Sequence, residues 1–218
     1  MQTTLFATDN SNSLSITEAE YHNSILKKAF AENDIRKLES FVLERLSNNK
    51  QQIFPSSIDT ALVYICKLAT PENSTKATYQ AIRYALSSPS YVTQLLAVRA
   101  IGTIKNPEFL SILLDLYHET VISGYHDVRI EIIKTVGHLG DNRATRILIH
   151  ALHRGVFEVP AALISLAQVG DLSAIPIMEH LLEYKDYINK IQTRETIKVI
   201  KEKYNVPLDS IMLLNWFS

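Results

Sequence analysis

The chain has 218 residues, of which 46% are hydrophobic and 21% are charged, and its formal net charge is −1. This apolar content can bury a continuous core, so we expect one folded solenoid or domain and not a disordered chain. A near-neutral chain has no cationic excess with which to bind a phosphate backbone, so nucleic acid is not an expected partner. The single cysteine, Cys66, rules out an internal disulfide framework.

The N-terminal residues lack the basic start and apolar core of a secretory signal. No apolar run approaches the roughly 20 residues that span a bilayer. We therefore expect a cytoplasmic protein without a membrane span, in which residues 1–14 form a flexible tail. Helical periodicity begins at Ile16, where Thr17 and Glu20 form a capping box that predicts a helix to about Glu32.

Three further helices are predicted before residue 90. Apolar residues recur on one stripe of residues 35–46, and the next helix, over 58–68, is apolar nearly all round. We expect neighbouring helices to surround this second one, so that Cys66 is a buried structural thiol. Ser74 is expected to cap the third, which ends near residue 86.

The remaining sequence predicts a regular alternation of helices and short turns. Proline falls in the first turn of several of these helices, where its missing N–H costs no helical hydrogen bond. The expected helices cover residues 90–104, 107–122, 126–139, 141–153, 156–169, 173–184 and 189–204.

One turn pattern occurs twice in this region, 30 residues apart. The first copy is Gly140-Asp141, the second is Gly170-Asp171, and Asn106-Pro107 forms a weaker third copy. Glycine tolerates the positive φ that ends a helix, while aspartate or asparagine caps the helix that follows.

An internal repeat of this period predicts an all-α fold, because each helical pair can bury its apolar face only by stacking on its neighbours. We expect a right-handed α-solenoid of about five helical hairpins over residues 15–205. Its clearest repeats cover residues 90–185, and residues 206–218 follow as a C-terminal cap or docking segment.

The sequence Asp127-Val128-Arg129, followed by the turn Leu139-Gly140-Asp141, resembles a HEAT-type repeat of the short form found in the phycobilin lyase family. In such repeats a Val-Arg pair opens the second helix and a Leu-Gly-Asp or Val-Gly-Asp turn ends it. Residues 143–152 fit the family's next first helix, and Val169-Gly170-Asp171 repeats the turn. The chain length is most similar to that of the smaller, F-type subunit.

This resemblance implies the bilin chemistry of cyanobacteria and red algae. In the family, E-type and F-type subunits pair to attach an open-chain tetrapyrrole to a cysteine of a phycobiliprotein. The resemblance implies phycocyanobilin or a related bilin as substrate, no tightly bound cofactor, and an E-type subunit and a phycocyanin α-like apo-subunit as partners. The alternative is a non-catalytic adaptor or scaffold of the same fold, such as a factor for phycobilisome degradation or chromophore detachment.

A bilin carries two propionates, pyrrole N–H groups and conjugated rings, so its site should combine cations, an acid and aromatic surface. Residues 125–138 contain the densest such mixture. The candidates are His126, Asp127 and His138 as catalytic residues, and Tyr125, Arg129 and Lys134 as bilin-binding residues. The structural alternatives are Asp127 as a helix cap and Arg129 as a tie between neighbouring hairpins, and for these two residues they are favoured.

Two other groups of side chains invite a functional interpretation. His150 and His153 lie three residues apart on one helix, but no cysteine or acid stands at a matching spacing, so surface histidines are favoured over a metal site. The apolar segment 206–218 is expected to cap the last repeat. Its Trp216 and Phe217 are alternatively a docking site for a partner subunit, because exposed aromatic side chains anchor interfaces.

Overall fold

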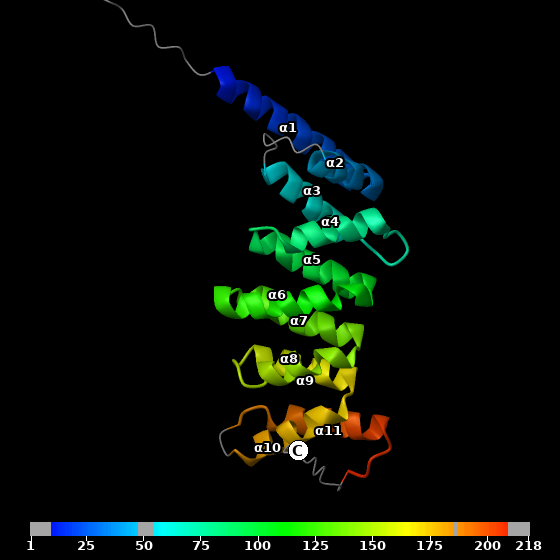
Figure 1. Cartoon of the computed structure of the whole chain (residues 1–218), viewed down its shortest axis with the longest axis vertical. Helices are drawn as coiled ribbons and strands as arrows, with labels where there is room; N and C mark the ends of the chain where they lie inside the picture. The colour runs from blue at the N-terminus through cyan, green and yellow to red at the C-terminus, as the bar shows by residue number, and fades with distance from the viewer. Residues whose placement is uncertain (1–9, 48–54, 185–186, 209–218) are drawn as a thin grey trace, which may run out of the picture. The chain divides into compact units, whose positions relative to one another are not determined.

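The structure is a computed structural model (Figure 1). The part of the chain that it describes consists of α-helices, short 3₁₀ turns and connections, with no strand. The structure describes residues 10–47, 55–184 and 187–208. The predicted all-α fold class is confirmed. The chain divides into two compact units, Met1–Ala97 and Val98–Ser218, whereas the sequence predicts one repeat region over 15–205.

The first unit is built around a central apolar helix. Its helices are α1 (Asn10–Ala31), α2 (Ile35–Ser47), α3 (Pro55–Leu68) and α4 (Lys76–Leu86), and α5 (Tyr91–Ile104) begins in it. Helix α3 packs against α1, α2 and α4. Ala61, Ile65 and Cys66 on α3 are buried, which agrees with the prediction that neighbouring helices surround this element.

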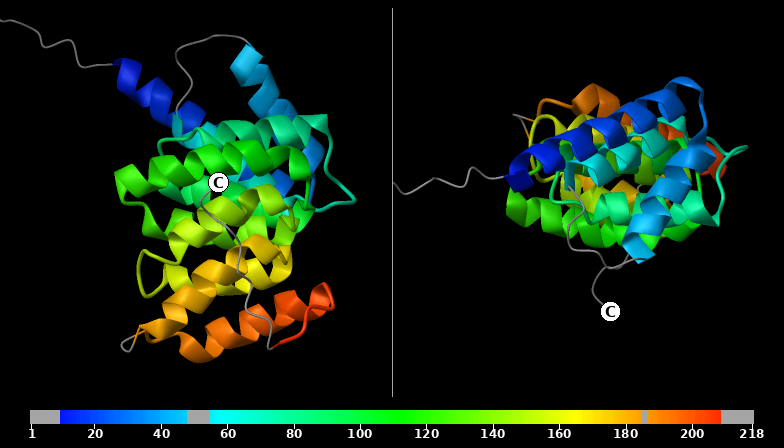
Figure 2. Two further views of the ribbon diagram at one scale, coloured as in Figure 1. Left: turned by 60° about the horizontal axis from the view of Figure 1, so that its bottom comes forward. Right: turned by 90° about the horizontal axis from the view of Figure 1, so that it is seen from above.

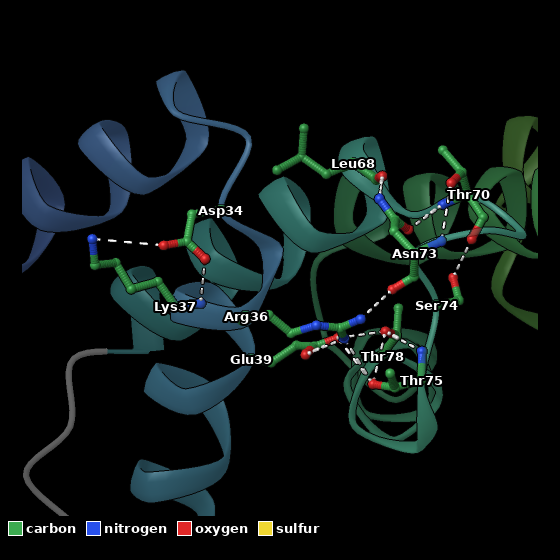
Figure 3. Close-up of polar contacts among 10 residues, drawn as sticks. All are labelled: Asp34, Arg36, Lys37, Glu39, Leu68, Thr70, Asn73, Ser74, Thr75 and Thr78. Atoms are coloured by element: carbon green, nitrogen blue, oxygen red, sulfur yellow. Dashed lines mark hydrogen bonds and ion pairs between the residues drawn. The ribbon is translucent and has the colours of Figure 1, made fainter.

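A buried carboxylate on α2 fixes the start of α4 (Figure 3). Glu39 accepts hydrogen bonds from the hydroxyl of Thr78 and from Arg36, whose Nη1 lies 2.9 Å from Glu39 Oε2. Arg36 also donates to the carbonyl of Asn73, in the connection between α3 and α4, at 2.9 Å. A buried charge requires such partners, so the network ties α2 to the first turn of α4.

The predicted starts of α1 and α4 differ from the structure. Thr75, and not Ser74, is the cap of α4, and its backbone N–H donates to the Thr78 hydroxyl at 2.8 Å. The hydroxyl of Ser74 donates instead to the carbonyl of Thr70 at 2.6 Å. Helix α1 begins at Asn10, before the predicted cap Thr17. Several neighbouring residues have capping side chains in both places, so local preference alone does not select one.

The second unit is built of helical hairpins, in each of which a first helix is followed by a second helix. Its elements after α5 are η1 (Pro107–Phe109), α6 (Leu110–Ser123), α7 (His126–Leu139), η2 (Asn142–Ala144), α8 (Thr145–Ala151), α9 (Glu158–Val169), η3 (Leu172–Ala174), α10 (Ile175–Glu183) and α11 (Lys190–Lys203). Each first helix packs on the second helix that follows it, as α6 does on α7, α8 on α9 and α10 on α11. The pairs of this unit can be followed from two further sides in Figure 2.

The repeated turns have the predicted geometry. Gly140 and Gly170 end α7 and α9 with φ of 67° and 69°. The carboxylates of Asp141 and Asp171 then accept hydrogen bonds from backbone N–H groups two residues on, both at 2.9 Å. Asn106 does the same before η1, at 3.0 Å. Each turn closes one helix and opens the next, so the sequence repeat is a structural repeat.

The second helices form one layer of this unit, held by a series of hydroxyl-to-carbonyl hydrogen bonds. Thr135 on α7 donates to Val98 O on α5 at 3.2 Å, and Ser165 on α9 donates to Ile133 O on α7 at 2.8 Å. One repeat later, Thr196 on α11 donates to Leu163 O on α9 at 3.3 Å. All three hydroxyl-bearing side chains are buried. Their hydrogen bonds therefore fix the distance between neighbouring second helices.

Candidate functional site

A buried ion pair joins α7 to α9. Arg129, 2% exposed, donates from Nε and Nη2 to Oε1 of Glu158 at 3.0 and 2.7 Å. Its Nη1 donates to the carbonyl of Thr120, near the end of α6, at 2.7 Å. One guanidinium therefore holds three helices, which supports the interpretation of Arg129 as a tie between hairpins.

The carboxylate of Glu158 is the acidic member of this cluster. Burial opposes its ionisation, but the hydrogen bonds and charge of Arg129 outweigh burial and hold the pKa of the Glu158 carboxyl below its ordinary value. Glu158 is therefore ionised at neutral pH. His126, at the start of α7, shares this cluster, because its Nδ1 faces Arg129 Nη2 and lies 3.6 Å from Glu158 Oε1.

These side chains form part of an open cavity of about 420 Å³, which we call the α7–α9 hollow. The first two turns of α7, the end of α8, the connection from α8 to α9, and the first residue of α9 surround it. Its lining residues are His126, Arg129, His150, His153, Arg154, Gly155 and Glu158.

His150, an exposed residue near the end of α8, is one of the basic residues that line the hollow. Its Nδ1 is 3.0 Å from the hydroxyl of Tyr117, a residue of α6 that is fully buried. Burial and then the positive charge of Arg154 lower the pKa of the His150 imidazole below its ordinary value. His150 is therefore neutral at pH 7 while the hollow holds no anion.

Arg154 and His153 are exposed at the rim of the hollow. Within the described residues, neither side chain has a hydrogen bond or an ion pair. The only carboxylate in the lining, Glu158, is already bound by Arg129. The hollow therefore has an unpaired positive charge at Arg154 and suits an anionic group.

The predicted residues of the segment 125–138 occupy two different places. His126 and Arg129 line the hollow, and Tyr125 precedes His126 as the N-cap residue of α7, 41% exposed. Asp127 is exposed in the first turn of α7 and is not its cap. Its proposed contact with pyrrole N–H groups stays a prediction.

Lys134 and His138 lie outside the hollow. Lys134 is exposed and forms an ion pair with Glu131 at 3.8 Å, while His138 is exposed in the last turn of α7. His126 and His138 are 12 residues apart, which separates them by about 18 Å along a helix. The two histidines therefore cannot act on the same ligand atom, and the roles of Lys134 and His138 stay predictions.

The residues that complete the hollow come from other repeats than the predicted segment 125–138. Glu158 follows Arg129 by 29 residues, which is about one repeat, and equivalent positions on successive second helices are expected to meet. The repeat period was the signal that could have paired them. His150 and His153 belong to the same site as Arg154, whereas the sequence suggested only surface positions for the two histidines.

An exposed apolar edge lies beside the hollow. The connections after α8 and after α10 lie on one side of the second unit (Figure 1). Val156 and Phe157, between the lining residues Gly155 and Glu158, are 65% and 76% exposed. Ile188 in the next such connection is 82% exposed. Exposed apolar side chains of this size are typical of contact surfaces.

A second cavity, of about 360 Å³, is lined by residues of α9 and α11. Ile164 on α9 and Val199 on α11 give it an apolar floor, and both are substantially exposed. Its other lining residues are Ala167, Gln168, Gln192, Glu195 and Thr196. The exposed surface of this groove is mainly apolar, although four of its seven lining residues have polar side chains.

Three predictions concern other features of the chain. Trp216 and Phe217, the predicted partner-binding residues, lie outside the described residues. Within the described ranges no group of three or more His, Cys, Asp or Glu side chains could hold a metal ion. In the same ranges no helix combines the length and the apolar character that crossing a membrane requires.

Comparison with known proteins supports the repeat assignment. A family model described as HEAT repeats matches residues 79–160, which include α5 to α8 and the ion-pair partners Arg129 and Glu158. No curated protein matches the chain. Residues 79–160 thus contain HEAT repeats, and the chain has an all-α solenoid fold. Repeats of this kind commonly bind other proteins along their stacked helices.

Proposed function

We propose that this chain is a phycobilin lyase subunit, which holds an open-chain tetrapyrrole while a cysteine of a phycobiliprotein adds to it. The observation that carries the proposal is the α7–α9 hollow, which combines two arginines, three histidines and one carboxylate. The hollow includes part of the segment in which the sequence resembles the lyase family. A binding site with converging polar groups favours a ligand-handling subunit over a broad, shallow docking face.

The groups of the hollow match the chemistry of a bilin. Arg154, which has no partner in the described residues, binds a propionate as a two-pronged donor. Glu158, the carboxylate of the hollow, is proposed to accept hydrogen bonds from pyrrole N–H groups in place of Asp127, which does not line the hollow. Tyr125 and Phe157 supply exposed aromatic surface beside the hollow.

The reaction itself needs no further reagent. The cysteine thiol adds across an exocyclic C=C bond of the bilin, a C–S bond forms, and the thiol proton ends on the bilin carbon skeleton. His126 is the proposed group for orienting the bilin: Arg129 donates to its Nδ1, so its Nε2 carries the hydrogen and donates to the ligand. The thiol gives its proton to water, and water protonates the bilin carbon. The subunit contributes mainly positioning, since the nucleophile belongs to the phycobiliprotein.

The proposed partners are an E-type subunit and a phycocyanin α-like apo-subunit. The exposed edge with Val156, Phe157 and Ile188 supports a protein contact next to the hollow. A bilin held there would lie close to the incoming cysteine.

The second candidate is a non-catalytic adaptor, such as a phycobilisome-degradation or chromophore-detachment factor. The apolar groove of α9 and α11 favours this alternative, because it offers a protein-binding surface that needs no bilin. An adaptor of this kind would bind phycobiliproteins whether or not they carry chromophore.

The deciding experiment is a transfer assay. The purified chain, with and without an E-type subunit, is incubated with phycocyanobilin and apo-phycocyanin α-subunit, and covalent bilin is measured after denaturing electrophoresis. A lyase subunit gives a bilin-labelled α-subunit band above the level of the spontaneous reaction. No increase in either mixture, together with binding of the chain to holo-phycocyanin, would establish the adaptor.

A further inference from the structure

The α7–α9 hollow has a positive charge in excess of the Arg129–Glu158 ion pair. Arg129 and Glu158 neutralise each other at 2.7 Å. Arg154 remains without a partner in the described residues, and three histidines line the same cavity. A solvent-exposed guanidinium that no carboxylate holds is free to bind an oxyanion.

We propose that the hollow is an oxyanion site, for a carboxylate or a phosphate, in which Arg154 binds the anion and His150 takes up a proton as it binds. The site is the one used in the proposed function, but the inference does not depend on a bilin. A carboxylate and a phosphate can both accept hydrogen bonds from the same donors, Arg154 and protonated His150.

The charged and polar groups around His150 couple its protonation to anion binding. On α6 it faces Tyr117, whose hydroxyl is 3.0 Å away, and the charge of His118. On α7 it faces Arg129, beside His126, and the connection after α8 adds His153 and Arg154. Of the hollow's lining residues, only Glu158 on α9 bears a negative charge.

An anion bound at Arg154 adds a negative charge to the mainly positive surroundings of His150. The positive neighbours, together with burial, lower the pKa of His150 in the empty site. An opposite charge within about 4–6 Å of a titrating group shifts its pKa by one to three units towards the charged form. Protonated His150 then adds a second charged donor to the anion, while its Nδ1 retains the Tyr117 hydroxyl as an acceptor.

The test uses two probes whose charge is nearly constant in the relevant range, sulfate as a phosphate-like oxyanion and glutarate as a dicarboxylate. Binding and the histidine titrations are followed by NMR of the imidazole rings, from about pH 8 to about pH 6. We expect at least one probe to bind about tenfold more tightly at the lower pH, with the His150 titration moving upward in its presence.

Three variants assign the effect to named residues. His150→Gln keeps a hydrogen-bonding side chain beside Tyr117 but cannot titrate, so anion binding should lose most of its pH dependence. Arg154→Ala should weaken binding at least several-fold at both pH values. Arg146→Ala is the matched control, because Arg146 is an exposed arginine of α8 that does not line the hollow.

Each outcome decides the inference. Binding of sulfate, of glutarate or of both with the expected pH dependence supports the site and identifies the oxyanion class. Lack of binding by both probes, or an unchanged pH dependence in His150→Gln with a native circular dichroism spectrum, overturns it. Anion binding without any bilin binding would remove the proposed lyase function and leave this inference standing.

Discussion

Nη2 of Arg129 lies 2.7 Å from Oε1 of Glu158, and this ion pair joins α7 to α9 across 29 residues of sequence. Both side chains are buried, and both also line the α7–α9 hollow. The same contact therefore holds two repeats together and forms the inner wall of the proposed binding site. Its loss would affect stability and ligand binding together.

Removal of one partner should strongly destabilise the second unit. Glu158→Ala leaves the buried guanidinium of Arg129 without its carboxylate, which costs about 3–5 kcal/mol of unfolding free energy in comparable pairs. The double substitution Arg129→Met with Glu158→Leu should recover most of this loss, because it leaves no unpaired charge. Urea unfolding followed by circular dichroism measures both. A Glu158→Ala protein within about 0.5 kcal/mol of wild type would contradict the account.

The ion pair should also make stability depend on acid pH. The folded-state pKa of Glu158 is lowered, so its contribution is fully present above the ordinary carboxyl pKa of 4.5 and is lost as the pH falls through the lower folded value. Wild type should therefore lose stability more steeply below about pH 4.5 than the Arg129→Met, Glu158→Leu protein. Urea midpoints measured at several acid pH values test the sign. Parallel pH profiles would show that the pair contributes nothing to the pH dependence.

Close packing of the second helices predicts a large effect at Gly137. A Cβ atom there would lie 2.5 Å from Ser165 Oγ and 2.6 Å from Ser165 Cβ, so α7 and α9 would have to move apart. Gly137→Ala should destabilise by about 1–3 kcal/mol despite the better helix propensity of alanine. Gly102→Ala is the matched comparison, because its nearest contact, Thr135 Oγ1, is 3.2 Å away. Equal stability of the two variants would contradict this packing.

Cys66 should be unreactive in the folded protein. The thiol is buried in α3, and this burial raises its pKa to about 12, so almost no thiolate is present at neutral pH. We expect a disulfide reagent such as DTNB to react with Cys66 only after unfolding in urea. Rapid reaction of the native protein would show that α3 is not enclosed by its neighbours.

The sequence predicts the local elements of this fold better than its site. Gly140, Asp141, Gly170 and Asp171 specify their turns through their own φ values and side-chain hydrogen bonds, so the ends of α7 and α9 were predictable. The start of α4 was less certain, because adjacent serine and threonine residues can both act as caps.

The hollow depends on contacts between distant residues. Arg129 and Glu158 meet only because α7 and α9 stack one repeat apart, and no local pattern marks Glu158 as its partner. His126 was predicted as a site residue from its neighbours in the sequence, and it does line the hollow. His138 was predicted on the same grounds, but the length of α7 separates it from that cavity.

The most direct test of the central claim is a titration of phycocyanobilin with the purified chain, alone and with an E-type subunit, followed by visible absorption. We predict a saturable change of the bilin spectrum that Arg154→Glu weakens at least tenfold, because the substitution puts a negative charge where a propionate binds. Arg146→Glu, an equal charge change outside the hollow, should leave the titration unchanged. No spectral change in either mixture, or equal binding by both variants, would contradict the assignment of the α7–α9 hollow as a bilin site.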